Sequence, residues 1–218
     1  MPATIHRLPT SIVQTTAPTD NVVMHLLYLH GFRSSPASFK ARRMADWMQA
    51  HRPDVHWWCP QLPPSPAAAW ALINQGIADW PRTPGPQGMA VVGSSLGGFY
   101  ATALAEATGC RAVLLNPAVD PARDLAAHIG EQTQFHAPDQ HFFFHPDYIA
   151  ELRALTVVSM TRPERYAAVI AQGDEVLDWR EMTARYPGAT VRLLADSDHG
   201  ISDFDEHLPF VLQFLGLT

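Results

Sequence analysis

The 218-residue sequence contains only two cysteines, and their spacing matches neither a disulfide framework nor a thiolate metal site. Basic residues are also few, since the sequence has 15 Lys and Arg but 21 Asp and Glu. It contains no run of basic residues that could bind along a phosphate backbone. No apolar stretch reaches the length of a membrane span, and the N-terminus lacks the basic start and continuous apolar segment of a secretory signal. We therefore expect a cytoplasmic protein that binds neither nucleic acid nor membrane.

The chain instead alternates short apolar runs with longer amphipathic segments. The apolar runs predict strands at residues 25–31, 55–60, 89–92, 111–119, 165–172 and 190–195. The amphipathic segments predict helices at residues 37–50, 67–80 and 99–107, after Asp178, and after Ser202, which can cap the last of them. This alternation predicts the α/β class, a doubly wound and mostly parallel sheet of about six strands.

The length allows one substantial core and at most two domains. Residues 1–23 are polar and interrupted by proline, so we interpret them as a loose N-terminal extension to a single domain at residues 24–218. Residues 120–164 interrupt the alternation, and we interpret them as a small cap or lid insertion. This insertion carries four histidines, His128, His136, His141 and His145. No helical pair of histidines with a neighbouring carboxylate appears among them, so we expect packing there and no metal site.

The segment "GMAVVGSSLGGFY" predicts a strand, a tight turn and a helix, and three kinds of site use a glycine-rich turn in that place. A phosphate loop would need a lysine where Phe99 stands, and a dinucleotide fingerprint would need a glycine where Ser95 stands. Gly93 to Gly97 does fit G-x-S-x-G, the nucleophile elbow of the α/β-hydrolase fold, with Ser95 at its centre. Ser95 is the predicted nucleophile.

A serine hydroxyl needs a base to take its proton, and that base needs a carboxylate to orient it. In this fold both follow the serine, the acid first, on loops after late strands. His199 in "DSDHG" stands after the last predicted strand and is the predicted base.

The acid has four candidates in the sequence, Asp174, Asp178, Asp196 and Asp198. Asp196 and Asp198 share a short loop with His199, whereas the fold brings the acid from the loop of the preceding strand. Asp178 stands where a helix N-cap belongs, with Glu181 three residues later as in a capping box. We therefore predict Asp174 as the acid, with Asp178 as its alternative.

The negative charge on an attacked carbonyl oxygen needs backbone N–H donors. One donor comes from the residue after the nucleophile and one from the loop after the first strand. These are the N–H groups of Leu96 and Phe32. His30, at the end of that strand, is expected to shape the loop.

Taken together, these residues resemble the YqiA-type esterases, a bacterial family of α/β-hydrolases. The resemblance covers residues 26–217 and rests on six blocks in order: "LLYLHGF", "PQLPP", "GSSLGGFYAT", "NPAV", "GDEVLDWRE" and "FLGL". It implies hydrolysis of small carboxylic esters with short acyl groups, without cofactor or metal, by Ser95 and His199. A thioesterase or a small serine peptidase would use the same residues, and a non-catalytic binding protein of this fold is a further alternative. The oligomeric state stays open.

Overall fold

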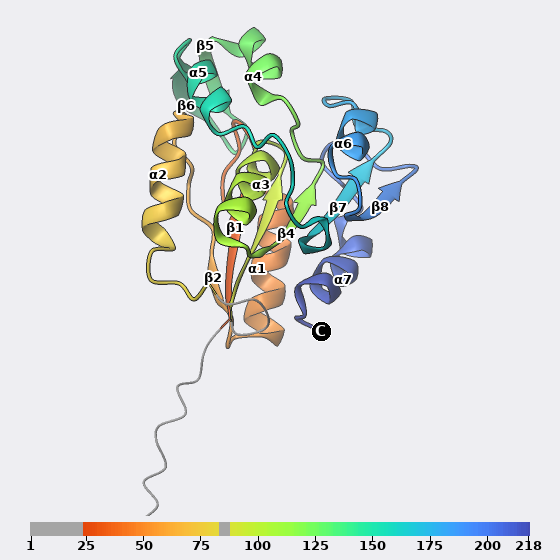
Figure 1. Cartoon of the computed structure of the whole chain (residues 1–218). Helices are drawn as coiled ribbons and strands as arrows, with labels where there is room; N and C mark the ends of the chain where they lie inside the picture. Colours follow the sequence, from red (N-terminus) through yellow and green to blue (C-terminus); the bar gives the residue numbers. More distant parts are fainter. Residues whose placement is uncertain (1–23, 83–87) are drawn as a thin grey trace, which may run out of the picture.

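The computed structural model describes residues 24–82 and 88–218, so the predicted extension at residues 1–23 lies outside the described residues. Six parallel strands form the main sheet in the order β2-β1-β3-β4-β7-β8 (Figure 1). Their bounds are β1 His25–Leu29, β2 His56–Trp58, β3 Met89–Ser94, β4 Arg111–Leu115, β7 Tyr166–Ala171 and β8 Thr190–Leu194. The predicted α/β class with a parallel six-stranded sheet is confirmed.

Helices cover both faces of this sheet: α1 Phe39–His51, α2 Pro66–Gly76, α3 Leu96–Thr108, α6 Trp179–Arg185 and α7 Phe204–Leu215. Alternate residues of β1 point to opposite faces. Leu27 and Leu29 pack with α2 and α3, whereas Leu26 and Tyr28 pack with α1 and α7. Because both faces are buried, the central strands are continuous apolar runs, which is why the sequence predicts them well.

The starts of α3 and α7 differ from the sequence prediction. α3 begins at Leu96 and not at Phe99, because Ser95 acts as its N-cap with φ 55° and ψ −122° and the glycines that follow are helical. α7 begins at Phe204 with Asp203 as the N-cap residue, so the prediction that Ser202 caps this helix is wrong.

Residues 120–164 form α4 Pro121–Asp124, a 3-10 turn at Leu125–His128, an antiparallel hairpin of β5 Gly130–Gln134 and β6 Ala137–Phe144, α5 Tyr148–Ala154 and a 3-10 turn at Pro163–Arg165. In Figure 1, α4, α5 and the hairpin lie together at one end of the molecule. Phe144 and Leu152 anchor the segment in the core, whereas Phe143 is exposed. Within the described ranges, no helix is long and apolar enough to cross a membrane.

Candidate active site

Ser95 lies at the turn between β3 and α3. Its φ is positive, a left-handed backbone conformation that residues other than glycine rarely adopt. The flanking glycines allow this turn, because strand and helix backbones nearly touch. A Cβ atom at Gly97 would overlap the carbonyl oxygen of Leu29, and one at Gly93 would overlap the carbonyl oxygen of Gly97. A residue held in such a conformation costs on the order of 1–3 kcal/mol, which the surrounding packing must offset.

The structure brings His199 and Asp174 to this serine. His199 Nε2 lies 3.2 Å from Ser95 Oγ, and His199 Nδ1 lies 2.7 Å from Asp174 Oδ2. The Asp174 side chain has no exposed surface, and its other oxygen accepts hydrogen bonds of 2.8 Å from the N–H groups of Val176 and Leu177. Because an ionised carboxylate only accepts hydrogen bonds, it requires a proton on Nδ1 and leaves Nε2 free to accept from the serine.

The other candidate acids lie elsewhere. Asp178 is the N-cap of α6 and accepts a hydrogen bond of 2.9 Å from the Arg180 N–H group. Glu181 does not fold back on this cap but forms a two-bond pair with Arg123. Asp198 accepts from the N–H group of Ser202, and Asp196 is exposed.

Asn116 holds the loop that carries His199, a role the sequence reasoning missed. Its side-chain NH2 group donates to the carbonyl oxygens of Asp198 and His199, both at 3.0 Å, and its oxygen accepts from the N–H group of Ala171 at 2.8 Å. It is fully buried and has φ 43°. The available signal was its position in "NPAV", directly after β4. Glu175 adds a further bond to the same loop, from the His199 N–H group at 3.0 Å.

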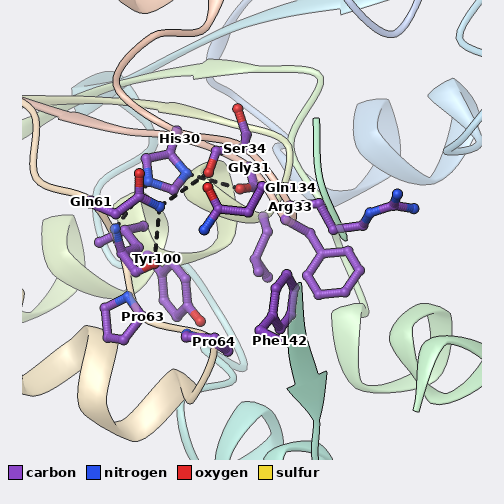
Figure 2. Close-up of a pocket in the computed structure, with 13 residues that line it drawn as sticks. His30, Gly31, Arg33, Ser34, Gln61, Pro63, Pro64, Tyr100, Gln134 and Phe142 are labelled. Atoms are coloured by element: carbon purple, nitrogen blue, oxygen red, sulfur yellow. Dashed lines mark hydrogen bonds between the residues drawn. The ribbon is translucent and has the colours of Figure 1, made fainter. Parts of the chain in front are cut away.

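His30 shapes the loop after β1, as expected from its position. Its Nε2 accepts from the Leu62 N–H group at 3.0 Å and its Nδ1 lies 3.0 Å from the Gly31 carbonyl oxygen, so the ring bridges two loops in the neutral form (Figure 2). Burial lowers the pKa of His30 and favours that form. The bridge holds Gly31 so close to the elbow that a Cβ added there would lie 3.1 Å from Ser95 Cβ.

Phe32 and Leu96, whose N–H groups are the predicted oxyanion donors, both line the space beside Ser95. The ring of Phe32 is held edge-on by Phe142 and Phe144 of β6, at centroid distances of 5.9 and 5.2 Å. The insertion therefore packs directly on the loop that carries one of these donors.

Arg33 ties the tip of the hairpin to the same loop, a second contact that the sequence did not predict. The Arg33 Nε donates to the Thr133 carbonyl oxygen at 2.7 Å, and its own carbonyl oxygen accepts from the Phe135 N–H group at 2.8 Å. Its guanidinium lies 4.5 Å from the centre of the Phe135 ring. These contacts place Phe135, which is largely exposed, in the walls of both spaces beside Ser95 and His199.

Two cavities meet at Ser95 and His199. One has a volume of about 210 Å³ and an apolar wall that includes Leu96, Leu125 and Leu177. The other has a volume of about 250 Å³ and is lined by the start of α1 and the tip of the hairpin. A molecule with its reacting bond at Ser95 can extend into both.

Three of the four histidines at residues 120–164 make separate contacts, and the fourth, His136, lines the cavity of about 250 Å³. His128 packs on the Phe32 ring, His141 lies 3.3 Å from a Glu131 oxygen, and His145 lies 3.2 Å from an Asp147 oxygen. Across residues 24–82 and 88–218, no three His, Cys, Asp or Glu side chains are grouped to hold a metal ion. That the protein works without metal or cofactor stays a prediction.

The doubly wound sheet with a serine on the turn after its third strand defines the α/β-hydrolase fold, and solved structures agree. A putative hydrolase from Agrobacterium vitis S4 has a TM-score of 0.70 at 19% identity, over 91% of this chain and 90% of that chain. Mouse alpha/beta hydrolase domain-containing protein 10 has a TM-score of 0.63 at 16% identity, over 87% and 89% of the two chains. A monoacylglycerol lipase from Paleococcus ferrophilus has a TM-score of 0.62 at 11% identity, over 89% and 95%.

The chain belongs to the Uncharacterised protein family (UPF0227), whose profile matches residues 25–216. This is the YqiA-like family, so the resemblance predicted from the six sequence blocks is confirmed.

Proposed function

We propose that this protein is a serine hydrolase that cleaves small carboxylic esters through an acyl-enzyme on Ser95. His199 acts as the base and Asp174 orients it. The observation that carries this proposal is the continuous chain of contacts from Asp174 through both nitrogens of His199 to Ser95 Oγ. The monoacylglycerol lipase among its structural neighbours supports the ester class.

In this mechanism Ser95 Oγ attacks the ester carbonyl carbon while His199 Nε2 takes its proton. The negative charge on the carbonyl oxygen is stabilised by the N–H groups of Phe32 and Leu96. His199 then donates the proton to the departing alcohol, which leaves the acyl group on Ser95. Water, deprotonated by the same imidazole, attacks the acyl-enzyme and releases the carboxylic acid.

The apolar cavity of about 210 Å³ supports a short acyl or alkyl group on one side of the ester. A thioester or a peptide would be cleaved by the same steps, and no contact of the described residues favours either over an ester.

A purely binding role would not require the Asp174 carboxylate to be buried against His199, because burial of a charge is costly unless it is hydrogen-bonded. The insertion at residues 120–164 acts as the cap of this site, and no metal or cofactor takes part.

Two neighbouring serines give the test a matched pair of variants. With a p-nitrophenyl ester of a short acid as substrate, Ser95→Ala abolishes hydrolysis and Ser94→Ala retains a substantial part of it. The thermal stability of Ser95→Ala stays nearly unchanged or rises slightly, because the strained turn serves function. An inactive Ser94→Ala beside an active Ser95→Ala would exchange the two roles, and full activity in both would refute the proposal.

A further inference from the structure

The second cavity beside Ser95 differs from the first in the charged residues of its wall, since its described lining holds Lys40 and no carboxylate. Ser38, Phe39 and Lys40, the N-cap and first two residues of α1, line it together with His136 from the hairpin. Ser95 and His199 lie at its boundary with the apolar cavity. A group bound here can therefore belong to a molecule whose reacting bond lies at Ser95.

Lys40 is the charged residue of this wall and is buried, with 8% of its surface exposed. Its ammonium donates one hydrogen bond, to the carbonyl oxygen of Gly200, although it carries three donors. Among the described residues, no carboxylate forms an ion pair with it, in contrast to Arg43 of the same helix, which pairs with Asp205 at 2.6 Å. A buried cation without an ion pair costs free energy, which a bound anion would offset.

The start of α1 adds to the positive potential. Ser38 occupies the N-cap position but makes no side-chain cap hydrogen bond, and the first turn of this 13-residue helix holds no acidic residue. The positive end of the helix dipole and uncapped N–H groups favour an anion at this place.

The remaining groups around the cavity do not supply a negative charge within it. Its described lining includes no Asp or Glu, whereas Asp124 lines the apolar cavity. Asp198 and Asp174 act on Lys40 electrostatically, but the burial of the ammonium outweighs them and lowers its pKa to about 8. The imidazoles of His30, His136 and His199 complete the titratable groups that face this space.

We propose that this cavity binds an anionic group of the substrate, a carboxylate or a phosphate, through Lys40 and the start of α1. The inference rests on the proposed esterase function and names its substrate class: small esters with an apolar group on one side of the reacting bond and a negative charge on the other. Lys40 is then a specificity-determining residue of the site.

The test compares kcat/KM for two matched pairs of esters. One pair carries the charge on the acyl side, an aryl hemisuccinate against its methyl-capped neutral analogue. The other carries it on the alcohol side, the butyrate ester of glycolate against that of glycolamide. The wild-type protein prefers the anionic member of one pair, and Lys40→Met lowers that preference about 10- to 100-fold, the range expected for a hydrogen bond between charged groups. The pair that responds identifies which side of the ester the cavity holds.

Arg43→Gln is the matched control, since it removes one positive charge from the exposed side of the same helix and leaves the preference unchanged. Lys40→Arg retains part of the preference. In the wild-type protein the preference falls as the pH rises through about 8, because Lys40 loses its proton there, whereas kcat/KM for the neutral ester does not share this fall.

The ratio of kcat/KM between the anionic and the neutral ester shows whether Lys40 binds the substrate anion or only positions the loop of His199. If Lys40→Met slows both members of a pair equally, Lys40 only holds the loop of His199 through Gly200, and the proposal is overturned. Should the variant fail to fold, the pH profile of the wild-type preference decides, and a preference that is absent or independent of pH overturns the proposal. Hydrolysis of the neutral esters without any preference rejects this inference alone, while failure to hydrolyse any ester rejects the function on which it rests.

Discussion

Replacing Asp174 with Asn changes one carboxylate oxygen into an NH2 group and removes the charge beside His199. Asp174 Oδ1 accepts two backbone hydrogen bonds of 2.8 Å, so the amide oxygen of the new side chain keeps that position. The NH2 group then faces His199 Nδ1, which must accept a hydrogen bond where it donated one. The imidazole proton moves to Nε2, and the ring can no longer accept the proton of Ser95.

The expected loss of kcat in Asp174→Asn follows from this change of the His199 tautomer. A wrongly protonated histidine in such a triad lowers kcat by roughly 10⁴-fold, equivalent to about 5 kcal/mol of transition-state stabilisation. The melting temperature stays close to that of the wild-type protein, since both backbone hydrogen bonds and the volume of the side chain are kept.

Asp178→Ala is the matched comparison, four residues along the same loop. It removes the cap bond to the Arg180 N–H group, which costs about 1 kcal/mol of unfolding free energy. In a domain of this size that lowers the melting temperature by about 2–4 °C, while most of the turnover remains. Both rates on one ester and both melting curves are measured side by side. A folded, inactive Asp178 variant beside an active Asp174 variant would refute the assignment.

Three further outcomes are expected. Gly97→Ala lowers the free energy of unfolding by several kcal/mol in urea titration, because the added Cβ overlaps the carbonyl oxygen of Leu29. A free energy of unfolding equal to that of the wild-type protein would show that the backbones at Gly97 and Leu29 are not in such close contact. Activity is unchanged by EDTA. A loss of activity that added zinc reverses would show that the histidines at residues 120–164 hold a metal ion that the reaction needs. Burial lowers the pKa of His30 in the folded state, so its contribution to stability is present above about pH 6.5, the ordinary histidine value, and is lost as the pH falls below it. His30→Gln flattens that part of the pH–stability curve, and an identical slope in both proteins would contradict the burial argument.

The main sheet was predictable from the sequence because its strands are buried on both faces and leave continuous apolar runs, as in Leu26 to Leu29. The hairpin of β5 and β6 was not predicted. Most residues of β6 are at least partly exposed, and its pairing with β5 shifts register between Thr133 and Gln134. Without a buried face there is no alternating pattern in the sequence to indicate such a strand.

Some residues of the candidate site could be predicted from the sequence and others could not. Ser95, His199 and Asp174 were named from motif spacing and chain order, because the fold constrains where such residues stand relative to strand ends. Lys40 and Arg33 were not, since each meets its partner across a long stretch of sequence: Lys40 contacts Gly200, 160 residues away, and Arg33 contacts Thr133, 100 residues away. No local pattern carries information about such contacts.

The site at which a fluorophosphonate reacts tests most directly whether Ser95 is the activated nucleophile. This probe phosphonylates an activated serine without requiring knowledge of the substrate, and mass spectrometry of the digested protein locates the adduct. We expect one adduct on Ser95, formed by the wild-type protein and lost in His199→Ala, since the hydroxyl is a poor nucleophile without its base. An adduct on Ser94, or no adduct on a folded wild-type protein, would contradict the assignment of Ser95 as the activated nucleophile.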